Sequence, residues 1–224
     1  MKRNTWKLVI LLGILMILSA VMLCVYNYRE DQDAEAFSQN IMEMLKKEIP
    51  DPSPQKPEED STVLPEDDLF AAYEQQEPED TAKPSDIVIG QDAYCGFLSI
   101  PALELELPVM SDWSYPDLKR SPCRYSGSVQ THDLIIAAHN YPAHFGRLIE
   151  LQTGDLIRFT DTSGQTYDYA VAFTEYIAGT DVEQMFFGQS EDWELTLYTC
   201  TLSGQSRVTI RAALQQEENT EESA

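Results

Sequence analysis

The sequence predicts a mostly β protein, a closed or nearly closed β-barrel with short helices that is preceded by one transmembrane helix. Residues 8–26 contain no charged residue and are rich in Leu, Ile, Val and Met, which is typical of a membrane-spanning helix. From Ile87 onward, short apolar runs of strand length follow one another, with turn residues between them. Many short strands with few helical patterns favour a barrel.

Composition limits the classes of function. The chain has 224 residues, enough for one folded domain and additional segments. Its net charge of −23 argues against a nucleic-acid partner, because phosphate binding needs a basic surface. The four cysteines show no zinc-binding spacing, and we predict no metal site; they are Cys24, Cys95, Cys123 and Cys200.

The charges on either side of the apolar run predict its orientation. Lys2, Arg3 and Lys7 precede the run, whereas the segment after Arg29 is acidic. At a rise of about 1.5 Å per residue, a run of this length spans a hydrocarbon core of about 30 Å. The positive-inside rule then places the N-terminus in the cytoplasm and the rest outside. We interpret residues 1–28 as a cytoplasmic stub and a transmembrane anchor.

Two alternative interpretations fit this segment less well. A cleaved signal peptide has a shorter apolar core followed by a small-x-small site, but Leu18-Ser19-Ala20 lies inside the run. A lipoprotein needs a small residue before its modified cysteine, and Leu23 precedes Cys24. We therefore expect the anchor to be retained.

Residues 29–86 are expected to form an acidic, Pro-rich extracellular linker. Within the linker, apolar residues at four-residue spacing predict a helix over 34–49; they are Phe37, Ile41, Leu45 and Ile49. The barrel is expected over 87–214. An acidic, disordered tail is expected over 215–224.

The expected strands are short apolar or alternating runs bounded by turn residues. Their ranges are 94–100, 105–109, 134–138, 156–160, 167–173, 195–200 and 207–211. Residues 112–120 are expected to contain a helical turn. Asp161-Thr162-Ser163-Gly164 is expected to form the turn of a hairpin.

One strand ends on a thiol, and the next begins with a cation. Residues 195–200 alternate and end at Cys200, and a short polar turn containing Gly204 leads to Arg207. An antiparallel pair would place Cys200 and Arg207 close together. His139 follows another apolar strand. A cysteine accompanied by a histidine is a candidate nucleophile.

Each of these residues also has an ordinary structural interpretation. Cys200 could be a small buried hydrophobe, and His139 a hydrogen-bonded strand end. His132 and His144 fit the catalytic position less well, because they lie in turns or loops. Arg211 is a rival of Arg207, since the strand period of two places both on one face.

The combination of motifs resembles the sortase family. Thr196-Leu197-Tyr198-Thr199-Cys200 is similar to the TLxTC signature, His139-Asn140 to the histidine motif and Arg207 to the family's arginine. The resemblance covers about residues 87–214. Ala138 stands where many members have Gly, so the subclass is unassigned.

The resemblance implies an eight-stranded sortase-type barrel and a cysteine transpeptidase of Gram-positive cell surfaces. The substrate would be an LPxTG-like sorting signal near the C-terminus of a secreted protein. Cys200 would form a thioacyl intermediate, His139 would act as general acid and then base, and Arg207 would stabilise the oxyanion. The acyl group would pass to an amine of a cell-wall precursor or a pilin. No cofactor is implied; calcium, which some relatives bind, is left unassigned.

Four further residues are expected at the substrate: Thr199, Ala138, Met185 and Phe186. Met185 and Phe186 could equally belong to a core or lid cluster. Cys95 and Cys123 could form a disulfide or remain two buried thiols. Two other functions stay open, a cysteine endopeptidase that uses water as acceptor and a non-catalytic surface β-domain.

Overall fold

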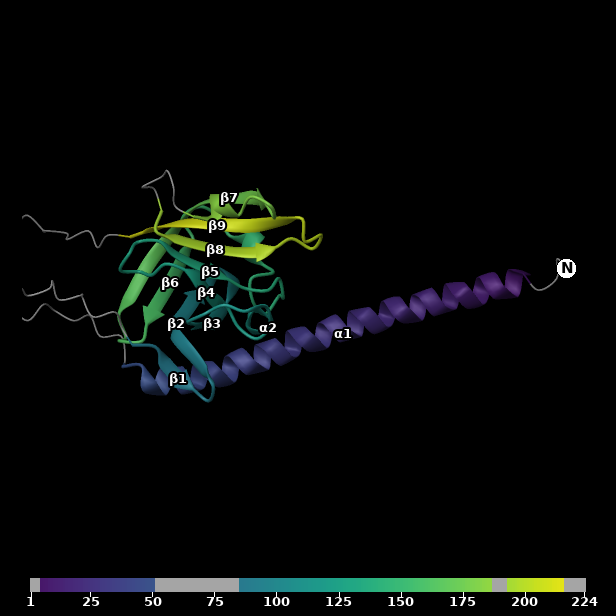
Figure 1. Ribbon diagram of the computed structural model, residues 1–224, viewed down its shortest axis with the longest axis horizontal. Coiled ribbons are helices and arrows are strands. Elements are labelled where there is room, and N and C mark those ends of the chain that lie inside the picture. Colours follow the sequence, from purple (N-terminus) through teal and green to yellow (C-terminus); the bar gives the residue numbers. More distant parts are fainter. Residues whose placement is uncertain (1–4, 51–84, 187–192, 216–224) are drawn as a thin grey trace, which may run out of the picture.

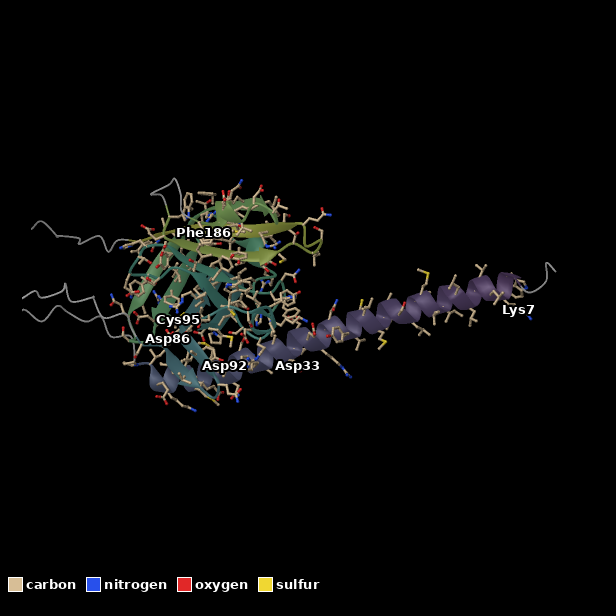
Figure 2. All side chains as sticks on the ribbon, viewed as in Figure 1. Lys7, Asp33, Asp86, Asp92, Cys95 and Phe186 are labelled. Atoms are coloured by element: carbon tan, nitrogen blue, oxygen red, sulfur yellow. The ribbon has the colours of Figure 1, made fainter. Side chains whose placement is uncertain are left out.

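The computed structural model describes residues 5–50, 85–186 and 193–215. It begins with one long helix, α1 (Thr5–Glu48), that leads from an exposed apolar segment to the barrel (Figure 1). Among the described residues, α1 is the one helix long and apolar enough to cross a membrane. In Figure 2, Lys7 lies at its far end and Asp33 lies where the helix reaches the barrel.

The helix expected over 34–49 is thus the final part of a longer helix, with no break near residue 28. Its four-residue repeat packs on the barrel, where Ile41, Leu45 and Ile49 are buried. They contact a cluster of barrel residues, which includes Tyr94, Met110 and Cys123. The remainder of the predicted linker, 51–84, and the tail, 216–224, lie outside the described residues.

Within the described residues, nine strands form the sheet. They are β1 (Ile87–Ile89), β2 (Asp92–Ile100), β3 (Leu105–Met110), β4 (Cys123–Ser126), β5 (Leu134–Ala137), β6 (Leu156–Asp161), β7 (Thr166–Ala178), β8 (Leu195–Cys200) and β9 (Ser206–Leu214). Their spatial order is β1-β2-β3-β4-β5-β8-β9-β7-β6, and β6 pairs back onto β2. Strands β2 to β9 therefore close into an eight-stranded barrel, with β1 added outside β2. This confirms the predicted fold.

The helices of the barrel domain are short, as predicted. Helix α2 (Tyr115–Leu118) begins after Ser114, whose hydroxyl accepts a hydrogen bond from the backbone N–H of Asp117, as an N-cap does. Three 3₁₀ segments complete the set: η1 (Pro101–Leu103), η2 (Leu148–Glu150) and η3 (Val182–Met185). The barrel interior is filled by large apolar side chains, among them Leu98, Ile136, Phe145, Leu197 and Ile210.

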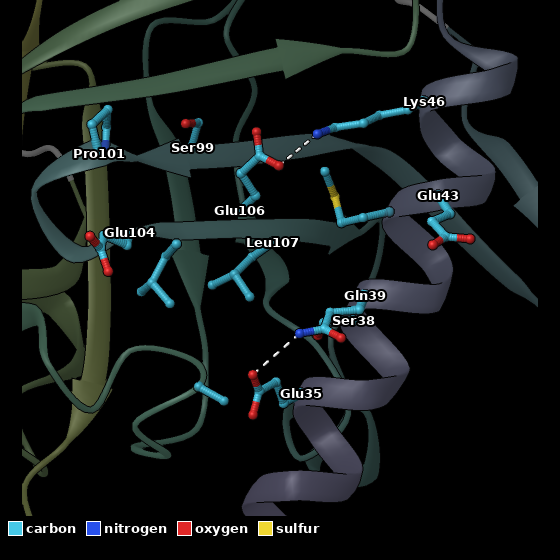
Figure 3. A pocket seen from close by; sticks show the side chains of 13 residues that line it. Glu35, Ser38, Gln39, Glu43, Lys46, Ser99, Pro101, Glu104, Glu106 and Leu107 are labelled. Atoms are coloured by element: carbon cyan, nitrogen blue, oxygen red, sulfur yellow. Dashed lines mark hydrogen bonds and ion pairs between the residues drawn. The ribbon is translucent and has the colours of Figure 1, made fainter.

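A pocket of about 700 Å³ lies between α1 and the β2–β3 hairpin (Figure 3). Its walls carry several carboxylates and one ion pair, Lys46 to Glu106 at 2.6 Å. His139, Cys200 and Arg207 do not line it. This pocket is therefore separate from the three residues predicted to be catalytic.

Candidate active site

Strand register brings the three predicted catalytic residues to one edge of the barrel. Strands β5 and β8 are parallel neighbours with Ala137 opposite Tyr198, so their carboxyl ends lie together. His139 follows β5, and Cys200 ends β8. Strands β8 and β9 are antiparallel, and Cys200 lies directly opposite Arg207 in their last pair.

The thiol of Cys200 is exposed at this edge. Leu195, Leu197 and Thr199 point into the barrel and are buried, so the alternation of β8 turns Cys200 outward. Cys95 and Cys123 are buried thiols, and burial raises the pKa of Cys123 to about 12. In the barrel, Cys200 is therefore the thiol within reach of a substrate.

Hydrogen bonds of Thr199 and Ala138 join the end of β8 to the segment that follows β5. The Thr199 hydroxyl donates to the carbonyl of Ala138 at 2.9 Å, and the Ala138 N–H donates to the carbonyl of Tyr198 at 3.2 Å. Both residues are buried. These contacts fix the spacing between the strand end that carries Cys200 and the segment that carries His139.

The imidazole of His139 is half-buried and stacks on Tyr141, with ring centroids 4.1 Å apart and an interplanar angle of 27°. Its Nδ1 is buried and has no hydrogen-bond partner within the described residues. Burial lowers the pKa of His139, and Lys119 lowers it further, whereas Glu30 acts in the opposite direction. A neutral imidazole is thus favoured in the free protein.

Arg207 is half-buried, and its guanidinium turns toward the β8–β9 turn. Its Nη1 donates to the carbonyls of Gly204 at 3.3 Å and Ser206 at 3.4 Å. These two hydrogen bonds are long and engage a flexible side chain at the rim. Rotation of the side chain would release donors toward a carbonyl bound at Cys200.

The rival cation, Arg211, is almost fully buried, with 2% of its surface exposed. It pairs with Glu175 at 2.8 Å, donates to the Thr196 hydroxyl at 2.8 Å, and donates to the carbonyls of Gln184 and Met185. Its donors therefore hold the β7–β8 connection against the sheet. Arg211 is committed to structure, whereas Arg207 lies opposite the thiol.

An aromatic surface adjoins the thiol on the outer face. The rings of Tyr125 and Tyr198 meet edge to face, with centroids 5.6 Å apart. The centroid of the Tyr125 ring also lies 5.3 Å from that of Trp113 and 6.0 Å from that of Phe186. Phe186, which Figure 2 labels, is exposed, whereas its neighbour Met185 is buried. Trp113 and Tyr125 were not among the residues predicted from the sequence. They are distant from Cys200 along the chain, and Tyr125 comes near the site because β4 pairs with β5.

The other two histidines lie outside this arrangement. His132 is exposed in the turn before β5. His144 is fully buried beneath α1, where its Nε2 lies 3.4 Å from the Ser38 hydroxyl. Burial, with a smaller contribution from His139, lowers the pKa of His144 to about 4.

This buried imidazole predicts a pH-dependent stability. Because the unfolded chain takes up the proton near pH 6.5, we expect full stability above that pH and a loss as the pH falls toward 4. A pKa difference of this size corresponds to about 3 kcal/mol of unfolding free energy. Urea unfolding in detergent micelles at pH 7, 6 and 5 measures it. His144→Gln should flatten the slope, whereas His132→Gln should keep it; equal slopes in both variants would contradict the assignment.

Comparisons with known proteins agree with the fold. The model of the sortase domain family matches residues 98–215, so the chain belongs to the sortase family and is an enzyme of the cysteine transpeptidase kind. No curated protein matches the chain. The subclass stays unassigned.

Two solved structures match the chain, and the first of them shares its fold. A lid mutant of sortase A from Corynebacterium diphtheriae has 21% identity and a TM-score of 0.51, covering 58% of this chain and 75% of that one. Sortase C from Streptococcus pneumoniae has 23% identity and a TM-score of 0.49, covering 55% and 69%.

Sortases generally need no cofactor. Within the described ranges, no group of three or more His, Cys, Asp or Glu side chains is arranged to hold a metal ion.

Proposed function

We propose that this sortase is anchored in the cell membrane and cleaves an LPxTG-like sorting signal of secreted proteins through a thioacyl intermediate on Cys200. The acyl group then passes to an amine of a cell-wall precursor or a pilin. The observation that supports this most is the register of β5, β8 and β9, which gathers His139, Cys200 and Arg207 at one edge. An exposed thiol beside a histidine and an arginine suits acyl transfer.

In the first step, the Cys200 thiolate attacks the scissile carbonyl carbon and a C–S bond forms. Arg207 turns from the Gly204 and Ser206 carbonyls and donates to the oxyanion. The C–N bond then breaks, and His139, which has taken the thiol proton of Cys200 as the thiolate forms, gives that proton to the leaving amine. In the second step, neutral His139 takes a proton from the acceptor amine, which attacks the thioester and releases the thiolate.

The position of α1 supports a substrate at the membrane surface. The apolar segment and the edge with the β8–β9 turn lie on the same side of the barrel (Figure 1). We infer that residues 1–28 anchor the enzyme with the N-terminus in the cytoplasm and the catalytic domain, 87–214, outside. A sorting signal that precedes its own apolar helix would then meet Cys200 near the bilayer.

The aromatic surface supports a peptide groove. Tyr125, Tyr198 and Phe186 present ring faces beside the thiol, and such faces bind extended apolar peptides. In this proposal Met185 supports the groove wall from beneath. Thr199 and Ala138 contribute to substrate binding by fixing the edge on which the peptide lies.

Transpeptidation in the presence of an added amine tests the proposal. The full chain is incubated with an LPxTG-type peptide and either oligoglycine or a diaminopimelate peptide, and products are identified by mass spectrometry. We expect a ligated product. Hydrolysis without ligation would favour a cysteine endopeptidase, which needs the same three residues. Peptide left intact, together with a thiol that does not react with a peptide mimic, would favour a non-catalytic domain.

A further inference from the structure

Helix α1 is attached to the loop that carries His139. The Tyr141 hydroxyl donates to Glu30 Oε2 at 2.7 Å, and the Ala143 N–H donates to Asp31 Oδ1 at 3.1 Å. Two turns further along the helix lies the Ser38–His144 contact described above. The loop following β5 is therefore bound to one face of the helix at three points.

Glu30 also reaches the second segment beside His139. Its Oε1 lies 3.4 Å from Lys119 Nζ at the end of α2, and it accepts a hydrogen bond from Tyr26. The carbonyl of Leu118, one residue earlier, accepts from the His139 N–H at 3.3 Å. Hydrogen bonds from Tyr26 and then Tyr141 lower the pKa of Glu30, so it is a carboxylate at neutral pH. One carboxylate thus joins the helix to both sides of the histidine.

Tyr141 is the link between Glu30 and the imidazole. The near-parallel stack at 4.1 Å fixes the plane of the His139 ring. Since Nδ1 has no hydrogen-bond partner among the described residues, no carboxylate or carbonyl there holds the ring, as one would in many His-dependent enzymes. The orientation of the ring depends on Tyr141, and the position of Tyr141 depends on its hydroxyl contact with Glu30.

We propose that Glu30 is a positioning residue for His139, acting through Tyr141, so that the part of α1 next to the apolar segment completes the active site. The proposal rests on the catalytic role of His139 given above. In this proposal α1 does more than attach the barrel to the membrane, because it supplies the contact that orients His139, the general acid and base. A barrel without this helix would lose that contact.

The charged groups around His139 make the proposal testable through the pKa of His139. Lys119 on the α2 side and burial lower the pKa of His139, and Glu30 raises it. The other groups nearby are Tyr141 and His144 on the same loop, and Cys200 and Arg207 on β8 and β9. Replacing Glu30 by an uncharged residue should therefore lower the pKa of His139.

The kinetic test uses the full chain in lipid nanodiscs with a sorting-signal peptide and an amine acceptor. Glu30→Gln and Tyr141→Phe should each lower kcat about ten- to a hundredfold, the effect of one lost hydrogen bond to a charged group, with KM unchanged within about twofold. Tyr141→Leu, which also removes the stack, should lower kcat further. Glu35→Gln is the matched control. Its contacts are with Gln39 (Figure 3) and Gln32 on the same helix, and its kcat should equal that of the parent.

A second readout does not depend on activity. The chain has three histidines, and NMR titration of the isotope-labelled side chains gives the pKa of each. Glu30→Gln should lower the pKa of His139 and leave that of exposed His132 unchanged. An unchanged His139 pKa together with a parent-like kcat would show that α1 only tethers the barrel and would overturn the proposal. A lowered pKa in a chain that catalyses no transfer would instead support the positioning contact and reject the proposed reaction.

Discussion

Replacing Cys200 with alanine should lower kcat/KM for a sorting-signal peptide by more than about a thousandfold, because no other thiol stands at the edge formed by β5, β8 and β9 in the described structure. The exposed sulfur at the end of β8 is the atom that would form the thioester. Cleavage of a fluorogenic peptide measures the rate, and intact mass spectrometry measures the acyl adduct. The adduct should be present in the parent and absent in Cys200→Ala.

Cys24→Ala is the matched control, since Cys24 is also exposed but lies in the apolar segment of α1. Its activity and its adduct should equal those of the parent. Retained cleavage in Cys200→Ala, with a stable fold by circular dichroism, would reject the thioacyl mechanism. An acyl adduct on Cys24 instead of Cys200 would also reject this mechanism.

Arg207→Ala should lower kcat by about a hundredfold to a thousandfold, the usual effect of removing an oxyanion donor. We expect little change in stability, because Arg207 bonds only to carbonyls of its own turn among the described contacts and is half-exposed. Arg207→Lys should recover part of the rate, since an ammonium keeps the charge and loses the planar pair of donors. Steady-state kinetics and thermal unfolding measure the two effects.

Arg211→Ala is the contrasting variant on the same strand. The Arg211 side chain is 2% exposed, and its removal would leave Glu175 and the Gln184 and Met185 carbonyls without their donor. We therefore expect a large loss of stability. If Arg211→Ala stayed stable and inactive while Arg207→Ala stayed active, the assignment of the two arginines would be reversed.

Much of the fold could be predicted from local patterns. Alternation in 195–200 and 207–211 identified two strands, and the short polar turn between them determined their antiparallel pairing with Cys200 opposite Arg207. The same alternation predicted that Cys200 and Arg207 would share a face, but it placed Arg211 on that face as well. Sequence could not separate the two arginines, because burial depends on the β7–β8 connection that covers Arg211.

Contacts between distant segments could not be predicted. The four-residue repeat of Phe37, Ile41 and Leu45 predicted a helix, but the repeat did not name the barrel as the surface that it covers. The helix also runs unbroken from the apolar segment, because no Pro or Gly interrupts residues 27–48. Similarly, Trp113 and Tyr125 join the outer face near Cys200 only because β4 pairs with β5.

The sequence by itself determined seven of the nine described strands, the apolar helix and the choice of His139, Cys200 and Arg207 as candidate catalytic residues, because periodicity and short motifs are local properties. Only the tertiary structure decided which groups surround them. Glu30 and Tyr141 are 111 positions apart, and they meet because a helix packs against the barrel beside the end of β5. The reason is physical: a hydrogen bond depends on separation in space, and packing of apolar faces sets that separation without leaving a pattern near either residue.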